Sequence, residues 1–340
     1  MSPSKLESFL QSFKADTQLR EFQEPVRAEL DEVDAVIRRF FDSQIPLVRG
    51  IAQHLLGVTG KKFRPTLLLL VSHQGEFRRD ETVFAATVIE LIHTATLIHD
   101  DTIDRSALRR GLPTINALYN DLVSTILGDY IYTKAFHELL QHDLPRVVPV
   151  VARTTYRMSI GEMLQLQQKN DLDVTQEQYF QLVDEKTASL MAAATEVGAI
   201  CGGLAEERVE RYRRFGEALG RAYQLTDDLF DFLGSPEVIG KGVQSDLAEG
   251  QVTLPLIYAL GHANSRERAR LREVAARKQL GQEDWRVLLG ILESSGAIDH
   301  CREKACELAE EAMQAIQEEP DSFWKDALHR AVAYAVQRSH

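Results

Sequence analysis

The chain has 340 residues, 44% of them hydrophobic, and a formal net charge of −12. This acidic balance excludes a nucleic-acid binder, because such a protein presents a basic surface to the phosphate backbone. It leaves open an anionic small-molecule substrate, which needs only a local group of Lys and Arg residues or bound cations.

The first residues and the cysteines indicate a soluble, cytoplasmic protein. Met1–Leu10 is polar and carries no apolar signal segment. The densest apolar run, Leu67–Val71, is far too short for a transmembrane helix, which needs about 20 residues. Cys201, Cys301 and Cys306 are odd in number and lack a metal-binding spacing, so we expect reduced thiols.

The predicted elements are almost all helices. Apolar residues recur every three or four positions in five segments: Glu81–Ile98, Glu177–Ile200, Glu206–Leu233, Asp284–Leu292 and Lys304–Ile316. No Gly/Ser/Pro-rich linker divides the chain, which predicts a single domain over residues 1–340. We therefore predict an all-α bundle of about ten or more helices with a central cavity, in which a central apolar helix is covered on all sides.

Two basic residues precede the first of these helices. Lys61 and Arg64 lie three residues apart where a helix begins, in the string GKKFRP. Arg matches phosphate oxygens with two parallel hydrogen bonds, and Lys acts as a point charge. Most single Lys and Arg side chains are solvated surface charges, but a nearby acidic cluster favours a role in binding an anion together with metal ions.

A first aspartate cluster, Asp100, Asp101 and Asp104, follows the helical stripe of Glu81–Ile98. Asp100 and Asp104 are four residues apart and share one helix face, about one turn from each other. Like charges this close repel unless a cation lies between them, and carboxylates completed by water and phosphate suit Mg²⁺. The alternative is a solvated acidic helix end.

His93 lies on the same helical face as this cluster. A His in an apolar helix is usually a satisfied core residue. Helical spacing, however, places Ile89, His93 and Thr96 in line with Asp100 and Asp104, so His93 points toward the predicted metal site.

Further cations follow along the chain. Arg109 and Arg110 come directly after the first aspartate cluster, and Lys186 enters a helix rich in alanine. Lys186 could instead pair with the neighbouring Asp184 or Glu185, as surface lysines often do.

The acidic pattern recurs inside a long apolar helix as Asp227, Asp228 and Asp231, and Lys241 follows it. Aspartates flanked by leucine and phenylalanine are costly to bury without partners. Two such helices facing each other could hold a diphosphate group through bridging Mg²⁺ ions, which neutralise a departing phosphate. The repetition favours a metal site over two solvated helix ends.

Together these motifs resemble the trans-isoprenyl diphosphate synthase family, the polyprenyl synthetases, and in particular its long-chain bacterial octaprenyl and heptaprenyl members. The similarity extends from about Gly60 to about Leu256 and rests on strings that occur in the family's order, namely GKKFRP, IELIHTATLIHDDTIDRSALRRGLPT, LGDYIYTKAF, GEMLQLQ, KTASL, YQLTDDLFDF and DLAEGQVTLPL. The resemblance implies an isoprenoid-synthase helical bundle and a trans-prenyltransferase. Such an enzyme condenses isopentenyl diphosphate with an allylic prenyl diphosphate to a long all-trans product, here for a quinone side chain.

The resemblance also implies Mg²⁺ as the cofactor and a role for each motif residue. Asp100 and Asp104 would bind Mg²⁺ with Asp101 in support, and Asp227 would bind another ion with Asp228 and Asp231 nearby through water. The allylic diphosphate would contact Arg109, Lys186 and Lys241. The isopentenyl diphosphate would contact Lys61, Arg64, His93 and Arg110. The path of the developing cation would be lined by Thr187 and Gln224.

Two positions depart from the family's pattern. Gln251 stands where the family usually has Lys after Glu-Gly, and Gln244 stands where it usually has Gly. Gln251 removes one positive charge from the expected diphosphate site, which puts a direct role for this position in doubt.

The product tail is expected to leave the metal site along the helix that carries Asp100. Ala95 and Thr96, one turn upstream, are small, whereas short-chain relatives place an aromatic ring there. The channel should therefore continue past Ile92 and hold about six to ten isoprene units, at about one unit per helical turn. Phe136 and Met163 are candidates for its floor.

Other functions remain open at this stage. A short-chain farnesyl or geranylgeranyl diphosphate synthase would share the motifs and differ in product. A terpene cyclase would leave the isopentenyl-site cations without a task, and a non-catalytic partner subunit could have lost its aspartates. A purely structural helical protein would not bind Mg²⁺ and diphosphate at all. The family implies a homodimer, and release of an apolar product implies transient membrane contact.

Overall fold

The computed structural model describes residues 17–57, 60–233, 245–277 and 280–337. These residues are helical almost throughout, which confirms the predicted all-α class. The first part contains η1 (Glu24–Val26), α2 (Arg27–Phe40), α3 (Pro46–Leu55), α4 (Phe63–Ser72), α5 (Arg79–Ile103), strands β1 (Leu108–Arg109) and β2 (Leu112–Pro113), α6 (Ile115–Leu118), α7 (Asp121–Gln141) and α8 (Val147–Gln168). The second part contains α9 (Gln176–Val183), the π-helical turn η2 (Asp184–Ala188), α10 (Ser189–Cys201), α11 (Glu206–Leu233), α12 (Ser245–Ala248), α13 (Leu254–His262), α14 (Ser265–Ala275), α15 (Gln282–Ser294), α16 (Ala297–Ala315) and α17 (Phe323–Gln337).

All five predicted helices are present, and Glu206–Leu233 has the predicted bounds. α5 and α15 extend beyond the predicted Glu81–Ile98 and Asp284–Leu292 at both ends, and the other two predictions differ more strongly. The prediction Glu177–Ile200 is divided into α9, η2 and α10, because a π turn inserts an extra residue without ending the helical path, and apolar periodicity does not detect it. α16 begins at Ala297, earlier than the predicted Lys304, because buried residues such as Cys301 extend its apolar stripe toward the N-terminus.

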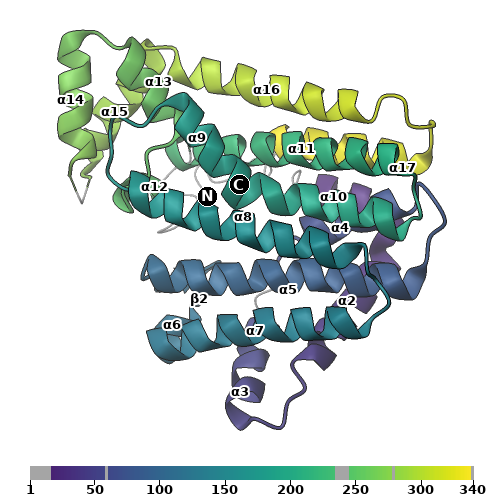
Figure 1. Ribbon diagram of the computed structural model, residues 1–340. Coiled ribbons are helices and arrows are strands. Elements are labelled where there is room, and N and C mark those ends of the chain that lie inside the picture. The colour runs from purple at the N-terminus through teal and green to yellow at the C-terminus, as the bar shows by residue number, and fades with distance from the viewer. Residues whose placement is uncertain (1–16, 58–59, 234–244, 278–279, 338–340) are drawn as a thin grey trace.

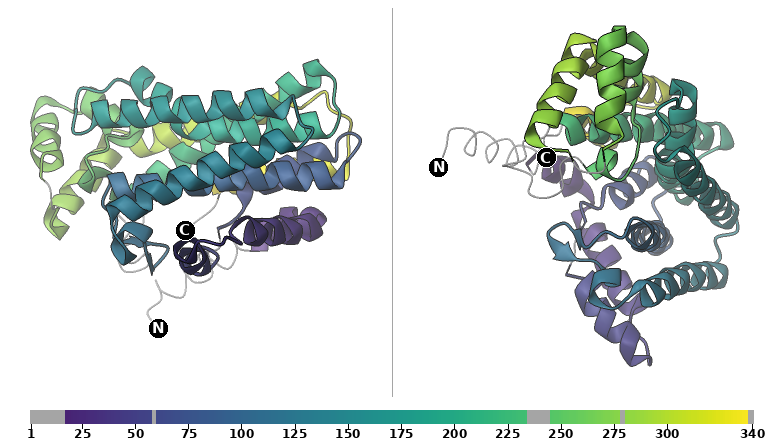
Figure 2. Two further views of the ribbon diagram at one scale, coloured as in Figure 1. Left: turned by 60° about the horizontal axis from the view of Figure 1, so that its bottom comes forward. Right: turned by 90° about the vertical axis from the view of Figure 1, so that its left-hand side faces the viewer.

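Helix α10 is the central helix that the apolar pattern predicted. From Ser189 to Ala199 every residue is buried, and α10 packs against α4, α5, α8 and α11. α4 is similarly enclosed, with Arg64 as its one residue that is not fully buried. The axes of the long helices are roughly aligned across the molecule in α5, α7, α8, α10, α11 and α16 (Figures 1 and 2). Helices α13–α15 gather at one end.

The described helices include one, α5, that is long and apolar enough to cross a membrane by length and composition. Of its most apolar 18-residue stretch, 67% is buried inside the bundle. A core helix surrounded by others must be apolar in the same way, so its composition follows from its place in the fold.

The C-terminal helix α17 returns to the beginning of the described chain. The Tyr334 ring lies 5.5 Å from that of Phe22 and 5.9 Å from that of Phe63, centroid to centroid. These aromatic contacts join both ends of the described chain to one core. The prediction of a single domain over residues 1–340 stays a prediction, since it includes residues outside the described ranges.

Candidate active site

The first aspartate cluster lies at the C-terminal end of α5, beside a cavity of about 360 Å³ that we call the acidic cavity. Asp100 and Asp104 both line it, and one carboxylate oxygen of each is buried without a hydrogen-bond partner. Asp101 is on the other side of the helix. There the Arg109 guanidinium donates hydrogen bonds of 2.9 Å to both of its oxygens. Asp101 thus forms an ion pair with Arg109, and its supporting role in Mg²⁺ binding stays a prediction.

The surroundings of Asp100 oppose its ionisation. Burial raises the pKa of Asp100 to about 7; the Lys186 ammonium lowers it and Glu162 raises it again. A carboxylate in this position gains from a cation that replaces lost hydration. Together with its unpartnered oxygen, and that of Asp104, this makes the residues present a fit for a hard divalent cation such as Mg²⁺.

Lys186 lies in the π turn η2 and reaches across the acidic cavity. Its ammonium donates to Gln165 at 2.8 Å and forms ion pairs with Glu162 at 2.7 Å and Asp100 at 3.6 Å. Burial by itself would lower the pKa of Lys186, but the charges of Asp100 and Glu162 raise it above its ordinary value. The ammonium is therefore held protonated next to the carboxylates, as a phosphate-binding cation must be.

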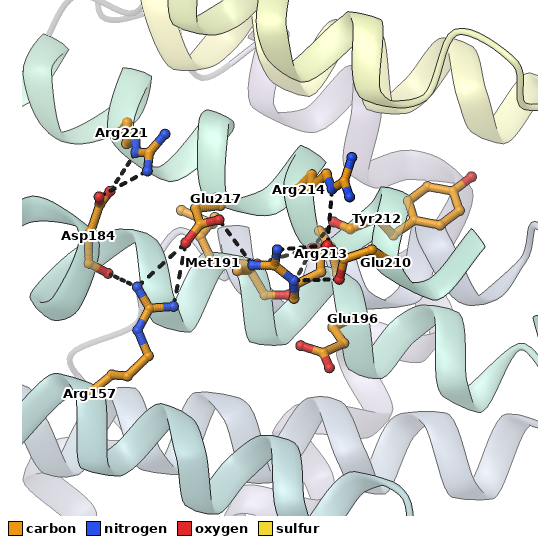
Figure 3. Close-up of polar contacts among 12 residues, drawn as sticks. Arg157, Asp184, Met191, Glu196, Glu210, Tyr212, Arg213, Arg214, Glu217 and Arg221 are labelled. Atoms are coloured by element: carbon orange, nitrogen blue, oxygen red, sulfur yellow. Dashed lines mark hydrogen bonds and ion pairs between the residues drawn. The ribbon is translucent and has the colours of Figure 1, made fainter. Parts of the chain in front are cut away.

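A network of ion pairs and hydrogen bonds stabilises the π turn η2 through Asp184 (Figure 3). The Arg221 guanidinium donates to the Asp184 carboxylate at 2.9 Å, and Arg157 donates to the Asp184 backbone carbonyl at 3.1 Å. On the other side, a Cβ at Gly161 would lie 2.6 Å from the Lys186 backbone nitrogen. Only glycine lets α8 approach the turn this closely.

From the second aspartate cluster, Asp228 lines the acidic cavity. The Tyr179 hydroxyl donates to it at 2.6 Å and the Gln224 amide at 2.7 Å, while Thr187 donates to Gln224 at 2.9 Å. Burial raises the pKa of Asp228 to about 7 despite these hydrogen bonds, and Asp227 adds to the rise. Thr187 and Gln224, both predicted site residues, are thus joined to Asp228 by a chain of hydrogen bonds.

Asp227 and Asp231 are half-buried, and neither belongs to the described lining of the acidic cavity. Residues one apart on a helix point about 100° away from each other, so the face that carries Gln224 and Asp228 turns Asp227 aside. Asp231 accepts a hydrogen bond of 3.3 Å from the Asp246 backbone N–H. Metal binding by Asp227 and Asp231 stays a prediction. Lys241 and Gln244 lie outside the described residues.

Among the described residues, the lining contains five carboxylates, from Asp100, Asp104, Asp228, Asp246 and Glu249. The cations that face them are Arg109, Lys169 and Lys186. Nowhere in the described ranges do three or more His, Cys, Asp or Glu side chains converge tightly enough to enclose a metal ion by themselves. A metal ion here would therefore complete its shell with water and with oxygens of a phosphate ligand.

A second cavity of about 100 Å³, the basic cavity, lies on the far side of Leu97 and Arg109, which line both. His93 and Arg110 line it as predicted, and the Arg64 guanidinium lies 3.1 Å from the His93 ring nitrogen. Burial lowers the pKa of His93 well below its ordinary value, and Arg64 and Arg110 lower it further. His93 is therefore neutral, and positive charge comes from the arginines.

Lys61 lies apart from the described lining of the basic cavity. Its ammonium is 5.8 Å from the centre of the Tyr334 ring, and its backbone carbonyl accepts a hydrogen bond from Gln23 at 2.7 Å. The adjacent Gly60 does reach the cavity, because a Cβ there would lie 2.9 Å from the Arg110 guanidinium. The structure thus brings Arg64, His93 and Arg110 together and leaves Lys61 at their edge.

A groove of about 960 Å³ leads away from Asp100 and Glu162 between α5, α7 and α8. Thr96 lines it, as predicted for a chain-length residue, and so does Phe136. Ala95 and Ile92 do not: both are buried in the apolar core, Ala95 against α7. The side chains of consecutive residues diverge around a helix, so Ala95 serves close packing while Thr96 faces the groove. Met163 is 68% exposed and outside the groove lining.

The family model for polyprenyl synthetase matches residues 45–292. The chain belongs to this family. It is 35% identical to the all-trans-nonaprenyl-diphosphate synthase of Rhodobacter capsulatus, over 92% of this chain and 96% of that one. It is 34% identical to the octaprenyl diphosphate synthase of Escherichia coli, over 94% of this chain and 99% of that one. A crystal structure of the Caulobacter crescentus polyprenyl synthase, complexed with calcium and isoprenyl diphosphate, matches with a TM-score of 0.89 and 31% identity, over 94% and 98%.

Several residues of this polyprenyl synthetase's site escaped the sequence reasoning. These are Glu162, Gln165, Tyr179, Asp246 and Glu249, which contact Lys186 or line the acidic cavity. Four of them lie in the strings GEMLQLQ and DLAEGQVTLPL, which carried the family resemblance but received no roles. Their position within these family strings was the feature of the sequence that could have identified them as candidates.

Gln251, the departure from the family pattern, does line the acidic cavity. Its amide donates to the Glu249 carboxylate at 3.2 Å. A neutral side chain therefore occupies this place in the wall of the acidic cavity.

Proposed function

We propose that this polyprenyl synthetase is a chain-elongating trans-prenyltransferase that joins isopentenyl diphosphate to an allylic prenyl diphosphate. The observation that carries the proposal is the pair of cavities on either side of Leu97 and Arg109. One is rich in carboxylates, and the other combines Arg109, Arg110 and His93 with the carboxyl groups of Glu90 and Asp101. Two anionic substrates would lie in adjacent sites, one held through metal ions and the other by side chains. Such positioning, with charge stabilisation, is the principal source of rate in group-transfer enzymes.

Mg²⁺ would be held by Asp100 and Asp104, with the second cluster on the opposite wall. When bound, Mg²⁺ would neutralise negative charge on the allylic diphosphate as its bond to carbon breaks. Its support is the pair of unpartnered buried carboxylate oxygens and the raised pKa of Asp100. The family's calcium-bound relative in Caulobacter crescentus holds a divalent cation together with an isoprenyl diphosphate.

The chain's own residues would act on the allylic substrate in two ways. Lys186 and Arg109 would hold the departing diphosphate as the allylic C–O bond breaks. Thr187 and Gln224, hydrogen-bonded to each other, would face the resulting allylic cation with oxygen atoms. The double bond of isopentenyl diphosphate then attacks the cation, and the released diphosphate takes the proton that is lost, so no side-chain base is required.

Arg64, Arg110 and neutral His93 would hold isopentenyl diphosphate in the basic cavity. Arg matches phosphate oxygens with two parallel hydrogen bonds. Glu90 lines the same cavity, and burial raises its pKa while the charges of Arg64, Lys62 and Arg110 lower it.

The groove would receive the growing tail. Its α7 wall runs from Asp129 to Leu140, about three turns or about 16 Å. At its outer end Leu140 and Tyr156 are 64% and 69% exposed, so a tail longer than the groove can continue past them. This arrangement supports a long product, with membrane contact where the apolar tail emerges.

A homodimer would form through α6 and α7. Leu122 and Ile126 are four residues apart on α7 and are 71% and 58% exposed, and Leu118 at the end of α6 is 46% exposed, so these neighbouring segments present several large apolar side chains to solvent. The three cysteines are free, as in a cytoplasmic enzyme. Light scattering after size exclusion should show a dimer for the wild type, and Leu122→Glu should shift it toward monomer.

The deciding experiment is product analysis with labelled isopentenyl diphosphate, Mg²⁺ and separate geranyl, farnesyl and geranylgeranyl diphosphate primers. The proposal expects long all-trans products of about six to ten isoprene units, and no reaction with chelator. Products that end at three or four units would identify a short-chain synthase. Cyclic hydrocarbons without isopentenyl incorporation would identify a cyclase. Absence of turnover in a folded, Mg²⁺-binding protein would identify a non-catalytic partner subunit.

A further inference from the structure

The three cations of the acidic cavity differ in how far their hydrogen-bonding capacity is used. Arg109 already donates to Asp101, and Lys186 to Glu162 and Gln165, so each keeps only part of its hydrogen-bonding capacity for a ligand. Lys169 makes a single contact among the described residues, an ion pair of 3.8 Å with Asp104, which is too long for a hydrogen bond. Its three ammonium protons are available to a ligand in the cavity.

Lys169 is nevertheless held in place by its backbone. It caps the C-terminus of α8, and the next residue, Asn170, donates its backbone N–H to the Gly250 carbonyl at 2.7 Å. Gly250 has a φ of +82°, and a Cβ there would lie 2.4 Å from the Asn170 side-chain oxygen. Because only glycine fits this contact, the loop after α8 is docked onto the turn that carries Gln251.

This docking places the charge of Lys169 beside the neutral wall of the cavity. Gln251 bonds to Glu249, and the charge of Lys169 lowers the pKa of that same Glu249 against the effect of burial. Lys169 and Gln251 therefore act on one carboxylate and line one cavity. The end of α8 thus adds a cation to a cavity wall in which position 251 carries a neutral amide.

We propose that Lys169 binds the diphosphate group of the allylic substrate and supplies, from the end of α8, the positive charge that Gln251 lacks. The proposal rests on the proposed function, because it takes the ligand of the acidic cavity to be a diphosphate. The competing role is structural, in which Lys169 does no more than neutralise Asp104.

An experiment that moves the positive charge from position 169 to position 251 separates these roles. Lys169→Gln, Gln251→Lys and the double variant are compared with wild type in their affinity for inorganic diphosphate with Mg²⁺, measured by calorimetry. The Michaelis constants for farnesyl diphosphate and isopentenyl diphosphate are measured in parallel. Lys304→Gln, which removes a half-buried lysine paired with Glu307 on α16, outside the described cavity lining, is the matched control.

Lys169→Gln should weaken diphosphate binding and raise the Michaelis constant for the allylic substrate by about ten-fold, the usual effect of losing a hydrogen bond to a charged group. The Michaelis constant for isopentenyl diphosphate should change by less than about two-fold. The double variant should recover most of the loss, because Gln251→Lys returns the charge to the same cavity.

Two outcomes would overturn the proposal. If Lys169 only neutralises Asp104, Lys169→Gln should leave diphosphate binding with Mg²⁺ unchanged or make it tighter. Failure of Gln251→Lys to restore binding in the double variant would show that the two positions do not serve one ligand. A wild type that binds diphosphate but elongates no primer would refute the proposed function while leaving the assignment of Lys169 testable by calorimetry.

Discussion

Asp100 is a residue whose position favours binding over stability. Burial raises its pKa to about 7, so in the metal-free protein its stabilising contribution is complete below pH 3.8 and is lost as the pH rises through about 7. A bound cation reverses this penalty by favouring the ionised form. A binding role for Asp100 would thus account for the free-energy cost of keeping a buried carboxylate.

Asp100→Asn should therefore separate activity from stability. We expect isopentenyl incorporation to fall by on the order of 10²- to 10³-fold at saturating Mg²⁺, because charge stabilisation of the departing diphosphate is lost. The melting temperature of the metal-free protein at pH 8 should be equal or higher, because Asn cannot ionise. Asp299→Asn, at a site that is 80% exposed, serves as the control. Near-normal turnover by Asp100→Asn would contradict the metal assignment.

His93 makes a prediction about pH. Its imidazole is neutral in the folded protein because burial and the charges of three arginines, Arg64, Arg110 and Arg109, lower its pKa well below 6.5. The unfolded chain takes up a proton near pH 6.5, so the stabilising contribution is present above that pH and is lost as the pH falls toward the folded pKa. Urea unfolding of the wild type should show a larger loss of stability from pH 7.5 to pH 5.5 than unfolding of His93→Gln. Equal losses would mean that His93 is protonated in the folded protein.

At the scale of elements, the acidic cavity depends on a π turn between two ordinary helices. η2 turns Lys186 and Thr187 toward the cavity, while Asp184 anchors the turn to Arg221 and Arg157 on the opposite side (Figure 3). Single-turn π insertions often occur at functional sites, since they redirect side chains without ending a helix.

Gly161→Ala tests the importance of this turn. A Cβ would lie 2.6 Å from the Lys186 backbone nitrogen, so α8 and η2 must move apart. We expect a loss of about 1–3 kcal/mol in the free energy of unfolding and a drop in kcat, because Lys186 is displaced. Gly290→Ala on α15 is the matched control, since no atom lies within 4 Å of its added Cβ, and it should be neutral or stabilising by up to about 1 kcal/mol. Similar effects of both variants would contradict a special role for Gly161.

At the scale of the whole molecule, the proposed control of product length depends on how α5, α7 and α8 are spaced. The groove runs from Asp100 and Glu162 past Tyr132 and Phe136, and Thr96 contributes no ring to its lining. The helices that enclose it also form the core, so a substitution on α5 can affect either the groove or the packing. Which of these it affects depends on the direction in which the side chain points.

Thr96→Phe and Ala95→Phe should therefore behave differently. Thr96→Phe places a ring in the groove, and mass spectrometry of its products should show shorter chains of about three or four units with condensation retained, at about one unit per helical turn. Ala95 is fully buried against α7, so Ala95→Phe should lower the melting temperature by overpacking the core, without a specific change in length. A full-length product from Thr96→Phe would show that the groove is not the product channel.

The sequence by itself determined which helices form and which chemical groups they carry. Helical spacing placed Asp100 and Asp104 on one face, and repetition of the acidic motif indicated a metal-dependent diphosphate site before any coordinates were known. These inferences are local: they depend on the 3.6-residue period and on the identity of side chains within a few turns. The bounds of α11 agree with the sequence prediction for the same reason.

The tertiary structure decided how these helices are rotated relative to one another. Rotation turned Asp228 rather than Asp227 into the described cavity, put Ala95 in the core and Thr96 in the groove, and brought Glu162 of α8 to Lys186. The π turn and the docking of Asn170 on Gly250 depend on contacts between segments distant in sequence. Apolar periodicity carries no information about such contacts, because they arise only when the faces of different helices meet.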